Sequence, residues 1–204
     1  MNPLLPQVYL ARHGETPWSL SGQHTGRTDI PLTSQGEANA QELGKRLSTI
    51  SFTHVFSSPL QRAMRTAALA GFERVTQAEP LLLEWDYGHY EGRRTKEIHE
   101  EKSDWLIFRD GCPGGESPED VAKRCDGLIQ KIQLLEKNTS GNILLFAHAH
   151  ILRMLAARWL HQSAQSGALY LLSTASLSIL GYEHHLLEPV IRLWNDTSHL
   201  NTSS

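Results

Sequence analysis

Short apolar runs alternate with amphipathic segments along this chain, and the alternation limits its fold more than any other feature. VYLA (8–11), HVFSS (54–58) and NILLFA (142–147) each indicate a buried strand bounded by turn residues. Segments with helical signals lie between them. This pattern is typical of an α/β fold whose central sheet is mostly parallel. We therefore predict a three-layer sandwich, with helices on both faces of the sheet.

Capping residues and apolar periodicity predict where the helices lie. Thr33 and Ser34 can cap the first helix, and Glu37, three residues after Ser34, fits a capping box. This helix should run to about Leu47 and bury Leu43. Further helices are expected over residues 59–70, near 95–109, over 117–137 and, after the HAH triplet, to about residue 161.

The rest of the chain is assigned to loops, outer strands and a tail. Residues 17–31 are rich in Gly, Thr and Ser, and we expect a loop there. RVTQA (74–78) indicates an edge strand, and SLSILGY (176–182) and PVIRLW (189–194) indicate a hairpin-like pair that closes the sheet. The polar tail at about 195–204 is expected to be loosely held. We expect one domain over residues 1–204, with an insertion at about 86–116 that carries substrate loops and a helix.

Composition excludes several classes of protein. The chain has 204 residues, of which 40% are hydrophobic and 20% charged, as in ordinary globular domains. A formal charge of -3 argues against a general nucleic-acid binder. No stretch long enough to span a bilayer lacks charges, and the N-terminus lacks a signal-peptide pattern, so we expect a cytoplasmic protein without a membrane partner. Cys112 and Cys125 are then expected to be free thiols, too few for a cysteine zinc site.

Charged and imidazole side chains follow three of the predicted strands. Arg12 and His13 come directly after the first strand, Arg62 follows the second, and His148 follows the strand 142–147. Ligands bind beyond the carboxyl ends of the strands in parallel sheets of this kind. The sequence therefore predicts that two arginines and two histidines meet at one edge of the sheet.

This group of residues fits a phosphate dianion. A guanidinium presents a planar fork of donors that matches phosphate oxygens, and Gly14 would let the main chain approach a ligand closely. Neighbouring cations favour a neutral imidazole, so His13 could attack phosphorus while Arg12, Arg62 and His148 stabilise the charge on the transferred oxygens. Glu84, which ends the apolar run LLLEW, is expected to hold a proton through desolvation and to act as general acid and then general base.

Each of these residues also has an ordinary structural interpretation. Arginine and histidine at a strand end are often solvated or salt-bridged, Arg62 could be a plain helix cation, and Glu84 a surface carboxylate. His148 and His150 could bind a metal ion, but no third ligand lies nearby in sequence. His184 and His185 are expected on opposite faces of a strand, where they would be structural. The combination of Arg12, His13, Arg62, Glu84 and His148 at one edge of the sheet is what favours the phosphate site.

The chain resembles the histidine phosphatase superfamily, also called the phosphoglycerate-mutase-like family. The resemblance rests on five segments in family order, namely RHGETPW, GQHTGRTDIPLTSQGEANA, FSSPLQRAMRTA, LLLEWDYGHYEG and LLFAHAHILR. It implies that His13 is phosphorylated, that Arg12, Arg62 and His148 surround the phosphate, and that Glu84 donates the proton. It also implies that no metal or organic cofactor is needed.

The resemblance further implies a set of substrate-binding residues. These are Ser19, Thr25, Gly26, Tyr87, Ala149 and His150. Within the family, the segments WSLSGQHTGRTD, EWDYGHYEG, FRDGCPGGES and FAHAH are similar to fungal-type sedoheptulose-1,7-bisphosphatases. Phosphoglycerate mutases usually carry Asn where Ser19 stands and Lys where Thr95 stands. The commoner glycine at position 149 is alanine here, which matters if the backbone there needs a positive φ.

We expect a phosphatase that acts on small phosphorylated sugars, such as sedoheptulose 1,7-bisphosphate, through a phosphohistidine. The alternatives are a broad phosphomonoesterase, a phosphoglycerate mutase, a non-catalytic phosphate-binding relative, and a metal binder that uses the chain's many histidines. The expected partner is a small phosphorylated substrate, with a homodimer as a possible assembly. Arg93, Arg94 and Lys96 are candidates for a second phosphate, although basic residues after a glycine are usually a solvated face.

Overall fold

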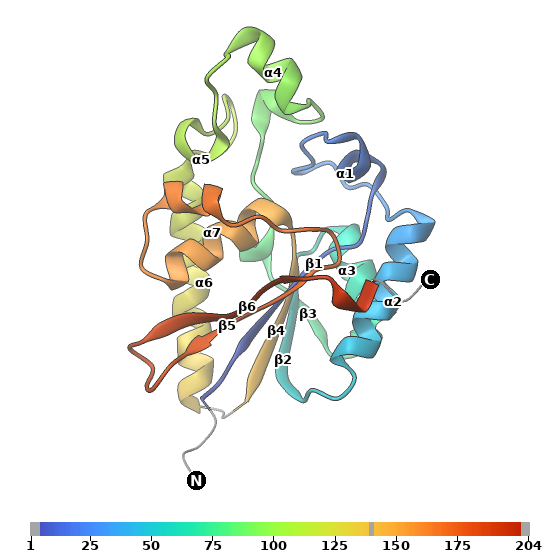
Figure 1. Ribbon diagram of the computed structural model, residues 1–204, viewed down its shortest axis with the longest axis vertical. Helices are drawn as coiled ribbons and strands as arrows, with labels where there is room; N and C mark the ends of the chain where they lie inside the picture. The colour runs from blue at the N-terminus through green and yellow to red at the C-terminus, as the bar shows by residue number, and fades with distance from the viewer. Residues whose placement is uncertain (1–4, 139–140, 201–204) are drawn as a thin grey trace.

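A six-stranded sheet forms the centre of the molecule (Figure 1). The structure is a computed structural model that describes residues 5–138 and 141–200. The strands lie in the order β3-β2-β4-β1-β5-β6, with bounds β1 Val8–Arg12, β2 Phe52–Ser57, β3 Thr76–Ala78, β4 Asn142–Ala147, β5 Leu177–Tyr182 and β6 Pro189–Asp196. β3, β2, β4 and β1 pair in parallel, whereas β5 and β6 add antiparallel ladders. The predicted mostly parallel sheet, its edge strand and its hairpin are confirmed.

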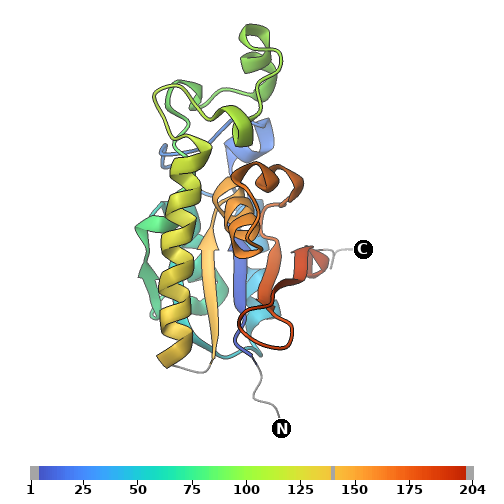
Figure 2. The same cartoon turned by 90° about the vertical axis from the view of Figure 1, so that its left-hand side faces the viewer.

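Helices cover both faces of this sheet (Figure 2). Alternate side chains of β1 point to opposite faces: Val8 and Leu10 pack with one hydrophobic cluster, and Tyr9 and Ala11 with the other. The first cluster includes α6 (Pro118–Asn138) and α7 (Ala149–Trp159), and the second includes α2 (Ser34–Leu47) and α3 (Gln61–Ala67). The predicted three-layer sandwich is therefore confirmed.

The first helices begin differently from the prediction. Thr33 alone caps α2, because its Oγ1 accepts a hydrogen bond from Gly36 N at 3.0 Å, while Glu37 accepts from Arg65 at 2.8 Å instead of closing a box. A capping box occurs earlier, where Thr16 and Ser19 bond each other's backbone N–H groups. It starts α1 (Pro17–Ser21), a helix inside the segment that we expected to be a loop.

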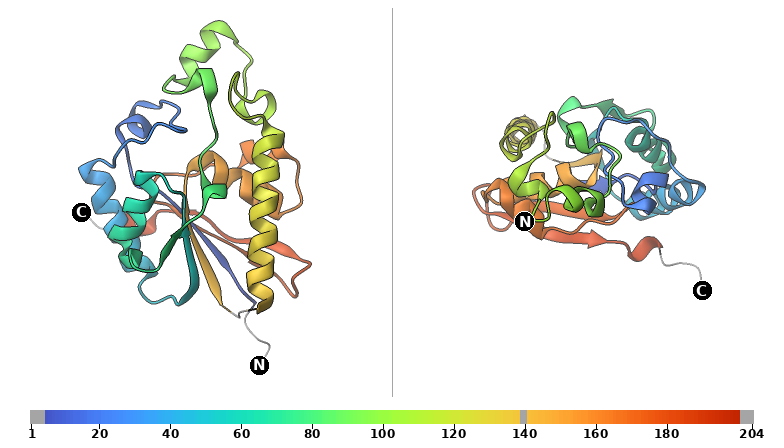
Figure 3. Two further views of the ribbon diagram at one scale, coloured as in Figure 1. Left: turned by 180° about the vertical axis from the view of Figure 1, so that it is seen from behind. Right: turned by 90° about the horizontal axis from the view of Figure 1, so that it is seen from above.

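The predicted helix near 95–109 is two short helices, α4 (Thr95–Glu101) and α5 (Ile107–Asp110). They belong to residues 80–116, which we call the excursion and which extend beyond the carboxyl edge of the sheet (Figures 1 and 3). The excursion also holds the 3₁₀ turns η2 (Pro80–Leu82) and η3 (Gly88–Tyr90). The excursion pairs with the chain after α1, since His24 N donates to Arg93 O at 2.9 Å and Gly92 N donates to His24 O at 2.8 Å. These two segments together cover the edge where the predicted site lies.

The C-terminal part is more firmly held than we expected. After α7 the chain forms the 3₁₀ helix η4 (Ala164–Leu169), the β5–β6 hairpin and the 3₁₀ helix η5 (Ser198–Leu200). Asn195 Oδ1 accepts from Ser173 N, and His199 Nε2 contacts Ala175 O, so residues 195–200 are bonded to the body of the protein. The rest of the predicted tail, 201–204, lies outside the described residues. None of the described helices has the length and apolar character needed to cross a membrane.

Two further predictions concern cysteines and histidines outside the strand ends. Cys112 and Cys125 are both buried free thiols, as predicted. His184 and His185 do not lie on opposite faces of a strand, because they occupy the turn between β5 and β6. Both contact the carboxylate of Glu188, at 2.7 Å and 3.2 Å.

Candidate active site

The carboxyl ends of three parallel strands bring the predicted residues together. Arg12 ends β1 opposite Ala147 of β4, and His13 N donates to Ala147 O at 2.9 Å. Ser58, directly after β2, donates from its backbone N to Phe146 O at 2.9 Å. The rings of His13 and His148 consequently lie with their centroids 5.1 Å apart.

The contacts of His13 fix its tautomer. Its Nδ1 lies 2.7 Å from Gly14 O, and because a carbonyl only accepts, Nδ1 carries the proton and donates it. Nε2 is then the nitrogen with an available lone pair, on a side chain that lines a pocket. Burial, together with the charges of Arg12 and Arg62, holds the pKa of His13 well below its usual value. The ring is therefore neutral at pH 7.

Gly14 has a different role from the one predicted. A Cβ at this position would collide with the carbonyl of Gly36, in the first turn of α2, and not with a ligand. Its N–H donates to Thr66 Oγ1 at 3.0 Å, and that hydroxyl donates in turn to Arg62 O. Gly14 thus allows α2 to pack closely against the turn that carries His13.

Arg62 and His148 form a buried pair behind the predicted nucleophile. Arg62 Nε donates to His148 Nδ1 at 3.1 Å, which leaves the proton of His148 on Nε2, 2.8 Å from Ser58 Oγ. Three further N–H bonds of Arg62 reach the carbonyls of Thr25, Gly26 and Thr28. Burial and the Arg62 charge lower the pKa of His148 well below its usual value. Both nitrogens of His148 are hydrogen-bonded within the protein. The pair therefore offers a ligand the positive charge of Arg62 in a fixed position, and few free N–H donors.

Arg12 is the cation with the most available donors. Its Nη1 donates to Leu172 O at 2.5 Å, and its buried Nε has no hydrogen-bond partner among the described residues. A buried donor without a partner is costly unless a ligand satisfies it. Burial lowers the pKa of Arg12 to about 10, so the guanidinium still carries its charge at pH 7.

The carboxylate of Glu84 lies against the N-terminus of α7. Its Oε1 accepts from Trp85 N and Ile151 N, both at 2.9 Å, and its Oε2 accepts from His150 N at 3.0 Å. The carboxylate is 3% exposed and lines the same pocket as His13. Backbone N–H donors at a helix N-terminus stabilise a negative charge. The sequence interpretation considered only the burial of Glu84 and did not reveal these three donors, two of which come from the start of α7.

A pocket of about 310 Å³ opens between α1, the excursion and the start of α7. Eight of the predicted site residues line it, namely Arg12, His13, Ser19, Thr25, Glu84, Tyr87, Ala149 and His150. Arg62, His148 and Gly26 are buried outside its lining. Ala149 begins α7 and does not have a positive φ, so the alanine there is unstrained. A larger hollow of about 470 Å³, on the α2–α3 side, contains none of the predicted residues.

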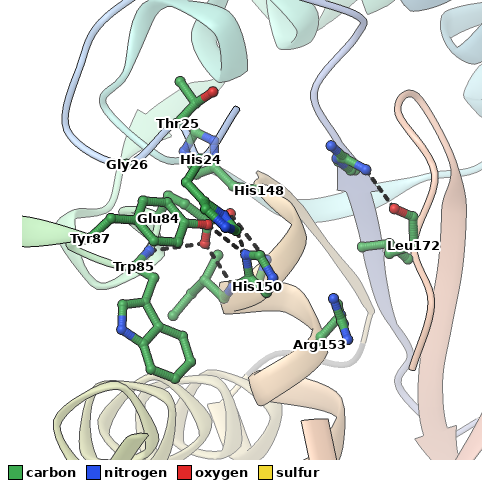
Figure 4. A network of polar contacts seen from close by, with 12 residues as sticks. His24, Thr25, Gly26, Glu84, Trp85, Tyr87, His148, His150, Arg153 and Leu172 are labelled. Carbon is green, nitrogen blue, oxygen red and sulfur yellow. Dashed lines mark hydrogen bonds and ion pairs between the residues drawn. The ribbon is translucent and has the colours of Figure 1, made fainter. Parts of the chain in front are cut away.

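Three ring side chains form one wall of the pocket (Figure 4). Tyr87 OH lies 2.5 Å from His150 Nδ1, and burial raises the pKa of Tyr87 well above its usual value, so the hydroxyl donates. Burial and the Arg153 charge lower the pKa of His150 well below its usual value. His24 stacks near Tyr87 with centroids 4.8 Å apart, and burial lowers its pKa to about 4. All three groups are neutral at pH 7 and offer polar atoms to a ligand.

The structure adds residues that the sequence interpretation missed. Arg153 and His24 line the pocket. Arg153 lies one turn after His150 on α7, and this i, i+3 spacing could have identified it. Arg124 of α6 donates to the carbonyls of Leu81 and Leu83 and so fixes the segment before Glu84, a long-range contact without a local signal.

The predicted alternative of a metal site at HAH does not fit the contacts. The lone pair of His148 accepts from Arg62, and that of His150 accepts from Tyr87. Among the described residues, only Glu183, His184 and Glu188 bring three potential ligand atoms within 4.8 Å of one another. They lie on the exposed β5–β6 turn, where the pairing of histidine with Glu188 already accounts for their geometry.

Comparison with known proteins finds phosphatases among the relatives of this chain. The profile of the histidine phosphatase superfamily (branch 1) matches residues 8–197. An acid phosphatase from Mycobacterium tuberculosis is 39% identical over 180 residues, covering 87% of each chain. Sedoheptulose 1,7-bisphosphatase from Saccharomyces cerevisiae is 36% identical over 187 residues, covering 78% of this chain and 69% of the other.

Solved structures agree with the fold. An open reading frame product from Mycobacterium tuberculosis superposes with a TM-score of 0.86 at 37% identity, covering 93% of this chain and 97% of the other. A phosphoserine phosphatase from Entamoeba histolytica, solved with 3-phosphoglyceric acid, superposes with a TM-score of 0.83 at 26% identity, covering 96% of this chain and 100% of the other.

Proposed function

The chain belongs to the histidine phosphatase superfamily, and we propose from this premise that it hydrolyses small phosphorylated metabolites through a phosphohistidine on His13. The family that the five sequence segments predicted is confirmed. The observation that carries the proposal is the tautomer of His13. Its Nδ1 proton is held by Gly14 O, so Nε2 is left as a neutral nucleophile on a side chain that lines the same pocket as Arg12 and Glu84.

In the first step, His13 Nε2 forms a bond to phosphorus and the bond from phosphorus to the ester oxygen breaks. Arg12 and Arg62 stabilise the negative charge on the remaining phosphate oxygens, and the Nδ1–H bond to Gly14 O stabilises the positive charge that the ring gains. The leaving oxygen takes a proton from Glu84.

In the second step, the carboxylate of Glu84 takes a proton from water, and the water oxygen displaces His13 from phosphorus. The three backbone N–H donors around Glu84 hold its carboxyl group in place for this step. Phosphate leaves and the neutral imidazole is restored. Acid and base roles thus alternate on one residue.

The preferred substrates carry a second anionic group, as sugar bisphosphates do. Arg153 lines the pocket and stacks over Phe108 with its guanidinium carbon 4.7 Å from the ring centroid. Its Nε and Nη2 donate to the neutral carbonyls of Gly167 and Ala168, and it forms no ion pair with a carboxylate among the described residues. Its charge is therefore available to a ligand. The earlier candidates are less suitable, since Arg93 pairs with Glu101 and both Arg94 and Lys96 are exposed outside the pocket.

A substrate screen tests the proposed reaction. Sugar monophosphates and bisphosphates, sedoheptulose 1,7-bisphosphate among them, are incubated with the protein, and both free phosphate and isomerised product are measured. We expect phosphate release without isomerisation. Relocation of phosphate without release would favour the mutase alternative, and inactivity on every ester would favour a non-catalytic relative.

Substitution of Arg153 tests the substrate class. Arg153→Met should raise KM about tenfold or more for bisphosphates, because a charge-assisted contact is lost, and should change KM little for an aryl monophosphate. Arg93→Met is the matched control, since this arginine is paired with Glu101 outside the pocket. Equal changes of KM for both substrates in Arg153→Met would contradict recognition of a second anion.

A further inference from the structure

A segment between η4 and β5 forms hydrogen bonds with Arg12 and His13, two predicted catalytic residues at the end of β1. We call residues 170–176 the strap. Leu172 O accepts from Arg12 Nη1 at 2.5 Å, and Ser176 O accepts from Arg12 N at 3.2 Å. Ala175 N donates to His13 O at 3.0 Å. The strap therefore fixes the guanidinium of Arg12 and the backbone of His13 at once.

The strap adopts a backbone that needs external support. Ala175 is fully buried and has φ 52°, a left-handed conformation that residues other than glycine adopt reluctantly. In this conformation its N–H donates to His13 O. Strained residues of this kind persist where the surroundings hold them in place, and they gather at functional sites.

Three side chains from the C-terminal segment supply that support. Trp194 Nε1 donates to Leu171 O at 2.7 Å, and Asn195 Oδ1 accepts from Ser173 N at 2.7 Å. His199 Nε2 lies 2.9 Å from Ala175 O and, facing a carbonyl, is the donor. Every second residue of the strap from 171 to 175 is thus bonded by the segment 194–199. Leu172, whose carbonyl accepts from Arg12, lies between the first two of these bonded residues.

We propose that Trp194, Asn195 and His199 are positioning residues that act on the reaction through the strap. None of the three lines the pocket, so they act through Arg12 and His13 and not on the substrate directly. The proposal rests on the proposed function of His13 for its effect on rate. The mechanical part, that the C-terminal segment holds the strap and the strap holds the end of β1, stands on the hydrogen bonds alone.

Position 195 allows a sharp test, because Asn195 itself has φ 54°. Asn195→Gly tolerates this backbone but removes the acceptor for Ser173 N, whereas Asn195→Asp keeps an acceptor oxygen. His199→Phe keeps a ring but removes the donor to Ala175 O. The control is His54→Phe, a half-buried histidine on β2 whose bond is to the adjacent Thr53. Each variant is measured for kcat and KM on an aryl phosphate, for thermal stability, and for amide hydrogen exchange over residues 9–16 and 170–176.

We expect Asn195→Gly and His199→Phe to speed exchange in both segments and to lower kcat about ten- to a hundredfold with little change in KM, because a small misplacement of reacting groups costs rate. Asn195→Asp should restore most of kcat, and His54→Phe should behave like the wild type. Unchanged exchange would overturn the proposal, and so would faster exchange with unchanged kcat. If the wild type hydrolyses no ester, the proposed function fails, while the exchange data still decide whether the C-terminal segment holds the strap.

Discussion

At the scale of single residues, the site depends on how each side chain's polar atoms are already engaged. His13 has one nitrogen committed to Gly14 O and the other available, whereas His148 has both committed. This difference is the reason why we propose His13 as the nucleophile, although both rings are neutral and lie together. A sequence pattern identifies both histidines but does not tell them apart on physical grounds, because the assignment depends on partners distant in sequence.

Replacement of Glu84 tests its role as general acid. Glu84→Gln keeps the shape of the side chain and removes the transferable proton. We expect a loss of about a hundredfold or more in kcat on sugar phosphates, whose leaving alkoxides need a proton, and a much smaller loss on 4-nitrophenyl phosphate. Steady-state kinetics on the two substrates checks this, and equal losses would argue against the role.

The predictable residues were those that follow a strand. Arg12, His13 and His148 could be found because the ends of parallel strands meet at one edge. Arg153 and His24 were missed, since their place in the pocket depends on how α7 and the excursion pack. The predicted ligand role of Gly14 was wrong for a related reason, because its close neighbour is α2, which comes from elsewhere in the chain.

At the scale of elements, loops from two parts of the chain hold Arg62, one of the predicted phosphate-binding cations. The carbonyls of Thr25, Gly26 and Thr28 accept from Arg62, and Glu91 in the excursion accepts from Gly26 N and Thr28 N. The excursion and the loop after α1 therefore orient Arg62 together. Capping and periodicity predicted the long helices well, but the short helices α1, α4 and α5 were missed or merged because their length leaves little periodic signal.

A pair of glycine substitutions tests this arrangement. In Gly26→Ala the new Cβ would lie 2.6 Å from Trp85 O and 2.5 Å from Glu91 Oε2, so the loop must shift and Arg62 loses its carbonyl partners. We expect a loss of about 1–3 kcal/mol in the free energy of unfolding and a lower kcat. Gly127→Ala is the control on α6, where the nearest atom would be 3.9 Å away, and it should stabilise by about 0.5–1 kcal/mol. Urea unfolding and kinetics check both, and a neutral Gly26→Ala would contradict the account.

At the scale of the whole molecule, the buried neutral histidines link the site to stability. Burial is the largest cause of the lowered pKa values of His13, His148 and His150. The unfolded chain takes up protons on these histidines near pH 6.5, whereas the folded protein does so only at much lower pH. Between these two limits the unfolded state binds more protons, so stability falls as the pH falls.

The pH dependence of unfolding checks this linkage. Each such histidine contributes up to about 1.4 kcal/mol per pH unit, so these three give up to about 4 kcal/mol per unit below pH 6.5. His24 and His199, whose pKa values burial also lowers, add to this slope. This is large against a typical total stability of about 5–15 kcal/mol. We expect urea unfolding at pH 7, 6 and 5 to show the fall, and His150→Gln to reduce the slope by up to about 1.4 kcal/mol per pH unit, the share of one histidine. A free energy of unfolding that stays constant from pH 6.5 to 5 would rule out three buried neutral histidines.

The central claim is that His13 carries the phosphoryl group during turnover, and a rapid-quench experiment with phosphorus-labelled substrate tests it most directly. The reaction is stopped in alkali, which preserves phosphohistidine, and the labelled peptide is sequenced by mass spectrometry. We predict a label on His13 that appears within the first turnover, is lost in acid, and is absent from the His13→Ala variant. Steady phosphate release with no label on His13, or with the label on another residue, would contradict it.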